Sequence, residues 1–255
     1  MLAPPDLPAI ALATAAGCVG GAMNALAGGG TFATLPSLIA LGLPANVANA
    51  TSNVALLPGA AASAAEYSDE LGPVGGMPVS ALAGITFAGG IVGSVLLVLT
   101  PSRDFDFIIP WLLLLGLVVM LFGRRASNWL HERATIGKPA LVVAQSMLAI
   151  YGGYFGGGVG LMLTATYGLL AGADPRSLFS VRTMMLAVAN LAAAIIFIAV
   201  GLVQWIACLP MLVGAIAGGW LGAKLGKRLP RELVNAWTLL VTTATTIVFF
   251  VRAYG

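Results

Sequence analysis

The side chain best suited to binding a charged ligand is Arg182, which lies inside a predicted apolar helix. It follows the loop Asp174-Pro175-Arg176 and precedes the apolar run Met184–Val200. A charge at mid-helix costs about 2.5–3.5 kcal/mol on membrane-insertion scales, and such residues usually face a cavity and mark an ion path. A planar guanidinium suits bidentate binding of an oxyanion. Two structural alternatives are that Arg182 extends to the lipid headgroups or that it pairs with Asp174.

Uncharged polar side chains fill four of the five positions 49–53, at the start of another predicted helix. A buried polar group costs free energy unless it is hydrogen-bonded. These side chains could donate to the oxygens of a small anion, or they could form polar contacts between helices. At an offset of 130 positions, Ser52 aligns with Arg182 and Asn53 with Thr183, which adds Thr183 to the candidate site. The four polar residues are Asn49, Thr51, Ser52 and Asn53.

Two glycine-rich runs, about half a chain apart, interrupt the apolar sequence. Glycine costs about 1 kcal/mol relative to Ala in a helix interior, and broken backbone is tolerated in lipid only where protein buries it or where it lines a cavity. A helix that begins at such a run presents unpaired N–H groups and a positive dipole end, which bind anions. The runs therefore predict an anion site, and tight packing of a turn is a compatible interpretation. The site residues from these runs are Gly28, Gly29, Gly30 and Thr31, and Gly156, Gly157 and Gly158.

These residues need membrane helices to position them. The chain of 255 residues is 59% hydrophobic and 8% charged, whereas a soluble domain carries roughly 25% charged residues. We therefore expect an all-α polytopic membrane protein. The segments 31–41 and 160–171 are shorter than the ~20 residues that span a bilayer, so each is predicted to be one arm of a broken or re-entrant hairpin. The other expected segments are 7–27, 46–66, 76–99, 105–123, 138–156, 176–200, 204–223 and 233–252.

The chain divides into two similar halves. The stretch 88–93 aligns with 217–222 at an offset of 129, and Gly42 aligns with Gly172 at an offset of 130. Each half has five predicted segments, and an odd number makes the second half enter the membrane in the opposite direction, as in inverted-repeat transporters. The predicted parts are a first membrane repeat over 1–123, a cytoplasmic linker over 124–137, and a second, inverted repeat over 138–255.

Further polar and small residues inside the apolar segments have structural interpretations. Asn24 and Asn190 are amides that either form helix contacts or line a site. Glycines in the aligned stretches have the small-xxx-small spacing of close helix packing. These glycines are Gly89, Gly90 and Gly93, and Gly218, Gly219 and Gly222.

Basic residues favour one orientation, since cytoplasmic loops carry an excess of Lys and Arg. With the linker in the cytoplasm, the outer side holds only Arg103 and Arg252. Both termini are then predicted to lie outside. The nine basic residues that this orientation places in the cytoplasm are Arg124, Arg125, Arg133, Lys138, Arg176, Lys224, Lys227, Arg228 and Arg231.

No basic region precedes the first apolar run, so we expect a retained helix rather than a cleaved signal.

The order of the motifs carries a family resemblance. The first half has Gly28-Gly29-Gly30-Thr31-Phe32, Leu35-Pro36, Gly42-Leu43-Pro44 and Ala48-Asn49-Ala50-Thr51-Ser52. The second half has Gly153-Tyr154-Phe155-Gly156-Gly157-Gly158-Val159-Gly160, Gly172-x-Asp174 and Gly218-Gly219-x-x-Gly222. This succession resembles the TauE/SafE family of sulfite exporters, also called the 4-toluene sulfonate uptake family. Ser180-Val181-Arg182-Thr183 stands where that family usually has a small Ala-x-x-Thr-Ser type sequence.

The resemblance implies transport of a small sulfur-containing anion, such as sulfite, thiosulfate or an organosulfonate, across a bacterial inner membrane. We expect a secondary transporter that exports the anion by alternating access around a midplane site. No Asp or Glu lies deep in a predicted helix, and export of one negative charge is favoured by ~2.3 kcal/mol per 100 mV of membrane potential. The alternatives are an uptake permease for thiosulfate or another small anion, and an anion channel.

An enzyme is not expected, because the chain has no His cluster, metal motif or pair of buried carboxylates. Cys18 and Cys208 lack the spacing of metal ligands. We therefore expect no cofactor and no metal site. The expected partners are the anion and the lipid bilayer, without nucleic acid, and a homodimer is one assembly that the sequence allows.

Overall fold

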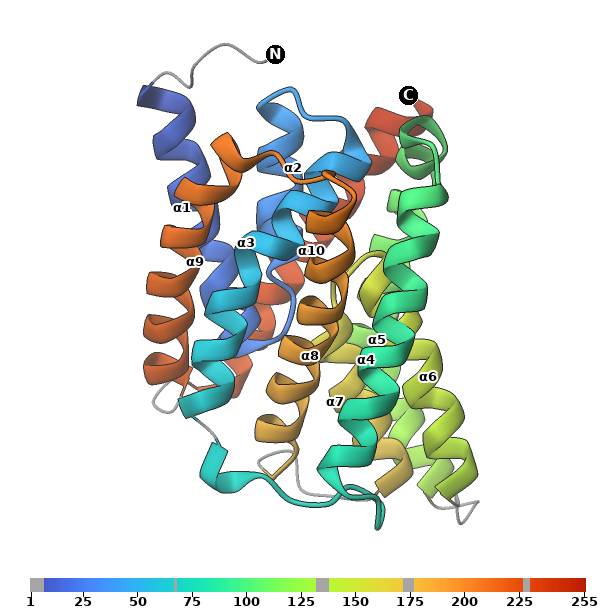
Figure 1. Ribbon diagram of the computed structural model, residues 1–255. Helices are drawn as coiled ribbons and strands as arrows, with labels where there is room; N and C mark the ends of the chain where they lie inside the picture. The colour runs from blue at the N-terminus through green and yellow to red at the C-terminus, as the bar shows by residue number, and fades with distance from the viewer. Residues whose placement is uncertain (1–6, 67, 132–137, 172–176, 227–229) are drawn as a thin grey trace.

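The computed structural model describes residues 7–66, 68–131, 138–171, 177–226 and 230–255 (Figure 1). Within these residues the chain forms ten α-helices and one short 3-10 helix, Ser68–Glu70. The α-helices are α1 (Leu7–Leu26), α2 (Thr31–Ala40), α3 (Ala45–Glu66), α4 (Val79–Leu99), α5 (Ser102–His131), α6 (Lys138–Tyr154), α7 (Val159–Ala171), α8 (Ser177–Ala199), α9 (Trp205–Gly226) and α10 (Arg231–Tyr254).

Six helices in the described part of the chain are long and apolar enough to cross a membrane, namely α1, α4, α5, α8, α9 and α10. The apolar helices α2 and α7 are shorter, as expected for the two arms that follow the glycine runs. The prediction of an all-helical membrane protein is therefore confirmed.

The expected segments and the observed helices differ most at α5. This helix runs to His131 and so enters the predicted linker. Neither Pro nor Gly follows Gly123 before Gly137, so nothing in the sequence breaks the helix where the apolar run ends. The remaining linker residues lie outside the described part of the chain, as do Gly172, Asp174, Arg176, Lys227 and Arg228.

The helix breaks at the glycine runs are confirmed. Between α1 and α2, Gly28 has a φ of +79°, and between α6 and α7, Gly156 and Gly158 have φ of +78° and +76°. This left-handed region is open to glycine and costly for other L-residues. The glycines therefore let the chain reverse inside the apolar layer.

Close packing by small residues joins the two halves. Helix α1 packs along α9, and α4 packs along α6. A Cβ atom on Gly218 of α9 would overlap the backbone of Cys18 in α1, and one on Gly93 of α4 would overlap the carbonyl of Ile150 in α6. The predicted glycine contacts between helices are therefore confirmed, and they bring the backbones together where lipid offers no hydrophobic driving force.

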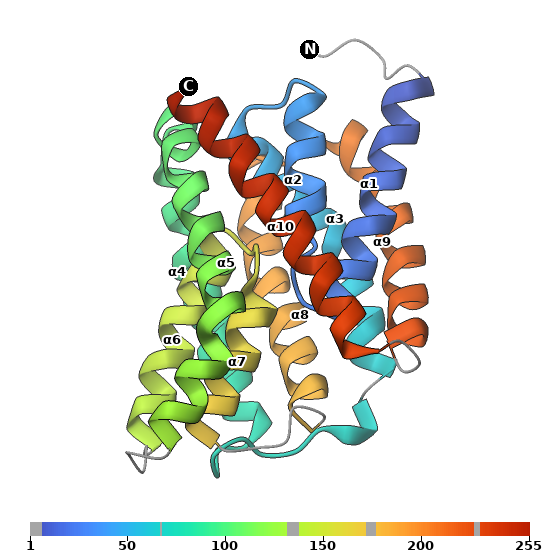
Figure 2. The same cartoon turned by 180° about the vertical axis from the view of Figure 1, so that it is seen from behind.

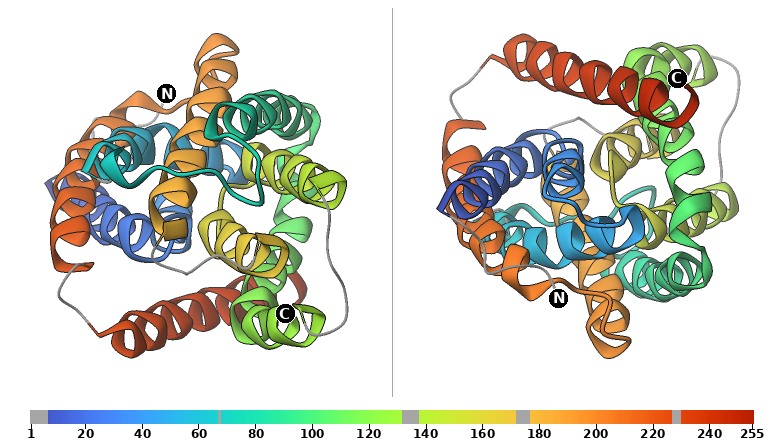
Figure 3. Two further views of the ribbon diagram at one scale, coloured as in Figure 1. Left: turned by 90° about the horizontal axis from the view of Figure 1, so that it is seen from below. Right: turned by 90° about the horizontal axis from the view of Figure 1, so that it is seen from above.

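Corresponding helices of the two halves run in opposite directions. In Figures 1 and 2, α1, α3 and α5 run away from the end where the chain begins, whereas α6, α8 and α10 run towards it. Helix α1 therefore begins, and α10 ends, at the same end of the molecule. Seen along the helices in Figure 3, α10 lies on one side of the body, where it packs on α2 and α5. This is the arrangement that an inverted repeat requires, and the exact equivalence of the halves stays a prediction.

Candidate functional site

The two glycine runs meet inside the protein. The Gly160 N–H donates to the Gly28 carbonyl at 3.3 Å. A Cβ on Gly160 would lie 2.5 Å from Gly28 Cα, and one on Gly28 would overlap Gly160. Only glycine permits this approach, so the backbone breaks of α1–α2 and α6–α7 are held against each other.

The first break is closed by a side chain of α1. Asn24 is 4% exposed and its Oδ1 accepts from the Gly30 N–H at 2.6 Å. This amide therefore satisfies one of the orphan donors at the start of α2. Next to it, the hydroxyls of Thr34 and Ser52 share a hydrogen bond of 2.5 Å, which ties α2 to α3.

The second break lies against α2 and α3. A Cβ on Gly156 would lie 3.5 Å from Asn53 Nδ2, 3.5 Å from the Gly152 carbonyl and 3.7 Å from Thr31 Oγ1. Three polar atoms from three helices therefore surround this point. The Tyr151 hydroxyl donates to the Gly157 carbonyl at 2.9 Å and fixes the middle of the run.

Arg182 lies beside the first break. Its side chain is 5% exposed, so the guanidinium does not reach the surface. Nη2 donates to the Ala25 carbonyl at 3.3 Å, and the guanidinium carbon lies 4.1 Å from the centre of the Phe179 ring. A cation at the C-terminal end of α1 complements the negative end of the helix dipole. The positive charge is thereby held at a carbonyl group three positions before Gly28 in the sequence.

The family model for the sulfite exporter TauE/SafE matches residues 13–249. The chain belongs to the TauE/SafE family. A probable membrane transporter protein of Haemophilus influenzae is 27% identical over 91% of this chain and 92% of its own length. The probable membrane transporter protein YfcA of Escherichia coli K12 is 25% identical over 92% of this chain and 87% of its own. No solved structure matches.

Membership of the TauE/SafE family makes the chain a membrane transporter and confirms the resemblance seen in the motifs. The matched range contains both glycine runs and Arg182. The candidate site therefore lies within the part of the chain that the family model matches.

Two residues assigned to the site have hydroxyl groups that bind outside the glycine breaks. Thr51 Oγ1 accepts from the Gln204 N–H at 3.0 Å, so it caps the start of α9. Thr183 Oγ1 donates to the Phe179 carbonyl of its own helix at 2.8 Å. The remaining assigned side chains, Thr31, Ser52, Asn53 and Arg182, all lie on or next to the glycine breaks.

The sequence alone did not assign Gly160 to the site, and for Asn24 and Asn49 it allowed both lining a site and forming helix contacts. Gly160 is the last glycine of the second run, and only the contact with Gly28 shows its role. Asn49 donates to the Tyr154 carbonyl at 3.1 Å, where α6 ends. The signal in the sequence was the position of Asn24 just before the first glycine run and the position of Asn49 in the polar stretch 49–53.

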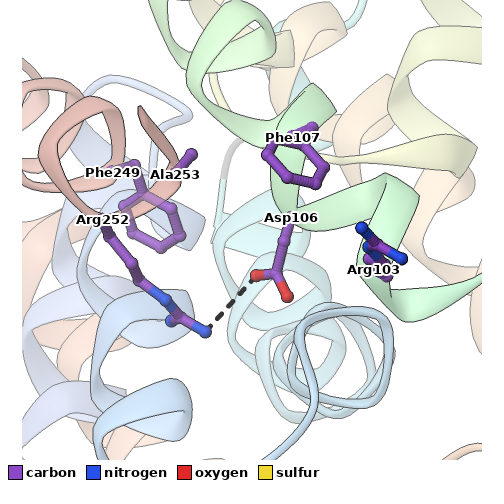
Figure 4. Close-up of a pocket in the computed structure, with 6 residues that line it drawn as sticks. All are labelled: Arg103, Asp106, Phe107, Phe249, Arg252 and Ala253. Atoms are coloured by element: carbon purple, nitrogen blue, oxygen red, sulfur yellow. Dashed lines mark ion pairs between the residues drawn. The ribbon is translucent and has the colours of Figure 1, made fainter. Parts of the chain in front are cut away.

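A separate cavity of about 200 Å³ lies between α5 and α10, and no described residue of the glycine breaks lines it (Figure 4). Arg252 Nη2 and Asp106 Oδ1 form an ion pair of 3.3 Å across it. Its lining comprises Arg103, Asp106, Phe107, Phe249, Arg252 and Ala253. Within the described residues, no group of three or more His, Cys, Asp or Glu side chains is placed to hold a metal ion.

Proposed function

We propose that this TauE/SafE family member is a secondary transporter that exports a small sulfur-containing anion, such as sulfite or an organosulfonate. The observation that carries the proposal is the contact between Gly28 and Gly160, because it brings two broken helices together at one point. In transporters, discontinuous helices of this kind form the substrate site near the bilayer midplane. The proposed membrane is the bacterial inner membrane, with both termini outside.

The anion would bind where α2 and α7 begin. Both helices present the positive ends of their dipoles at the breaks, and their first N–H groups have no partner within the helix. Two of these donors are engaged inside the protein, because the Gly30 N–H binds Asn24 and the Gly160 N–H binds Gly28. Neighbouring N–H groups and Asn53 Nδ2, the amide donor near Gly156, are the proposed anion ligands.

Arg182 is proposed to supply the positive charge of the site. Its bond to Ala25 holds the guanidinium beside the end of α1, so the charge needs no reorganisation when an oxyanion arrives. In the buried setting a fixed cation also offsets the desolvation of the anion.

Alternating access is proposed to arise by movement of the two halves around this contact. The two runs meet through glycine backbone and one interhelical hydrogen bond, from Gly160 to Gly28. Small residues at both the α1–α9 and α4–α6 contacts allow helices to slide with little side-chain interference. The anion then leaves the cell down the inside-negative potential.

Transport by purified protein in liposomes tests the proposal. Liposomes loaded with sulfite, thiosulfate, an organosulfonate or chloride would be given a membrane potential of either sign, and efflux of each anion would be measured. We expect efflux of a sulfur anion that is fast with an inside-negative potential and slow with an inside-positive one. This efflux should be at least tenfold slower for Arg182→Ala at equal incorporation into the liposomes. If no sulfur anion leaves the liposomes, the proposed substrate class is wrong. If single-channel currents are recorded, the protein is an anion channel and not a transporter.

A further inference from the structure

An amide of α3 closes the end of α6 and keeps one oxygen without a partner. Asn49 is 1% exposed and donates from Nδ2 to the Tyr154 carbonyl at 3.1 Å. Only the nitrogen of the amide can donate to a carbonyl, so Oδ1 is fixed as an acceptor. Among the described residues, nothing donates to this buried Oδ1 atom. A buried acceptor without a donor is costly, and it points to a ligand that carries positive charge or a donor.

Asn53 adds a second oxygen one turn along α3. Its Nδ2 donates to Asn190 Oδ1 at 3.3 Å, and its own buried Oδ1 has no partner in the described part of the chain. Positions four apart lie on one face of a helix, so Asn49 and Asn53 face the same break. Rotation of both amides would exchange donor and acceptor between Asn53 and Asn190, whereas the orientation of Asn49 is fixed.

Further oxygens lie near the end of α6. The Gly152 carbonyl and the Thr31 hydroxyl lie 3.5 and 3.7 Å from the position of a Cβ atom on Gly156. The amides of Phe155 and Gly156 both donate to the Tyr151 carbonyl, so neither reaches the Gly152 carbonyl. The C-terminal end of α6 also carries the negative end of its dipole. The free carbonyl and the negative dipole end favour a cation, and rotation of the Asn53 amide would turn its Oδ1 in place of Nδ2 towards the same point.

The two helix breaks differ in the charge of the side chain that binds the carbonyl group at the helix end. At the end of α1, the Ala25 carbonyl receives the cationic side chain of Arg182. Tyr154 aligns with Ala25 at an offset of 129, and Ser52 aligns with Arg182 at an offset of 130. The second break therefore has neutral amides of α3 where the first break has a fixed positive charge.

We propose that Na⁺ binds at the C-terminal end of α6, with Asn49 Oδ1 as its fixed ligand. Asn53 Oδ1, the Gly152 carbonyl and the Thr31 hydroxyl are the further oxygen ligands. Uncharged oxygens at a broken helix end are the environment in which transporters hold Na⁺, whereas Ca²⁺ and Mg²⁺ take carboxylates. The proposed Na⁺ site does not require a bound anion, so this proposal goes beyond the proposed function.

Thermal unfolding of the purified protein without any sulfur anion tests the site. Melting temperatures would be compared in NaCl, KCl and choline chloride at equal chloride concentration. We expect a rise that depends on the Na⁺ concentration and that KCl does not reproduce. Asn49→Ala should raise the Na⁺ concentration at half effect at least tenfold. The matched control is Asn46→Ala, in the same helix, whose Oδ1 accepts from the Val47 N–H at 2.8 Å.

Equal melting temperatures in the three salts would overturn the proposal and leave water as the partner of Asn49. An Na⁺ effect that persists unchanged in Asn49→Ala would overturn it too. If that variant fails to fold, Asn53→Ala keeps the bond to Tyr154 and should weaken the Na⁺ effect at least threefold. An Na⁺ effect without transport of a sulfur anion refutes only the proposed function, whereas transport without an Na⁺ effect refutes only the Na⁺ site.

Discussion

The contact between the two glycine runs makes Gly160→Ala the most informative substitution. Gly160 has a helical backbone, so alanine adds no strain of its own. Its Cβ would lie 2.5 Å from Gly28 Cα and 3.3 Å from the carbonyl oxygens of Ala27 and Gly28. All three are backbone atoms, so no flexible side chain can move aside. The two breaks must therefore separate.

The size of this effect follows from the geometry. Ordinary contacts begin at 3.4 Å, so the breaks must move apart by about 1 Å. Overpacking of a closed interior typically costs about 1–3 kcal/mol. Replacing a helical glycine by alanine returns up to ~1 kcal/mol through helix propensity. The matched control is Gly84→Ala in α4, because a Cβ there meets nothing within 4 Å and gains the same propensity.

We expect Gly160→Ala to melt about 2–12 °C below Gly84→Ala, since a protein of this size loses ~2–4 °C per kcal/mol. Anion efflux from liposomes should fall at least tenfold in Gly160→Ala and stay at the wild-type rate in Gly84→Ala. Thermal unfolding in detergent and the efflux assay measure the two effects. Equal melting temperatures and equal efflux for the two variants would refute the contact between the breaks.

Three further substitutions test single contacts. Asn24→Ala leaves the Gly30 N–H without its 2.6 Å acceptor and should lower stability by about 1–2 kcal/mol, measured by thermal unfolding. Tyr151→Phe removes the hydroxyl that donates to Gly157 and should cost about 1 kcal/mol and slow efflux. Asp106→Asn breaks an ion pair whose partners are 35% and 41% exposed, so we expect a change below about 1 kcal/mol.

Control variants and assays define, for each of these three substitutions, the result that would contradict the prediction. Asn46→Ala loses an amide on α3 away from the breaks, and a loss equal to that of Asn24→Ala would contradict the capping role. Tyr154→Phe loses a single half-buried bond of 3.3 Å to Thr100, so it should be milder than Tyr151→Phe. A loss of efflux in Asp106→Asn would move the transport path to the cavity between α5 and α10.

The membrane helices could be predicted from the sequence because apolar length and glycine runs act locally. The run 28–31 breaks the helix wherever it packs, since three glycines lower helix propensity on their own. The end of α5 could not be placed, because hydropathy marks where the apolar layer ends and not where the helix ends.

The contacts across the site depend on how the two halves pack. Gly28 and Gly160 are 132 positions apart, and nothing local indicates that their backbones touch. The same holds for Arg182, whose charge indicated an ion path but whose bond to Ala25 depends on where the fold places α8 relative to the end of α1. Thr51 and Ser52 are adjacent, yet one caps α9 and the other binds Thr34 on α2. Their separation follows from the directions in which neighbouring helical side chains point.

Binding of a sulfur anion at the glycine breaks is tested most directly by thermal unfolding with a panel of sulfite, thiosulfate, sulfoacetate, taurine, sulfate and chloride. A ligand at a hundredfold excess over its Kd stabilises the folded protein by ~2.7 kcal/mol. We expect stabilisation by sulfite or an organosulfonate that is lost in Arg182→Ala and kept in Arg252→Ala, an arginine of the separate cavity. Stabilisation that is kept in Arg182→Ala and lost in Arg252→Ala would contradict the account and place the anion between α5 and α10.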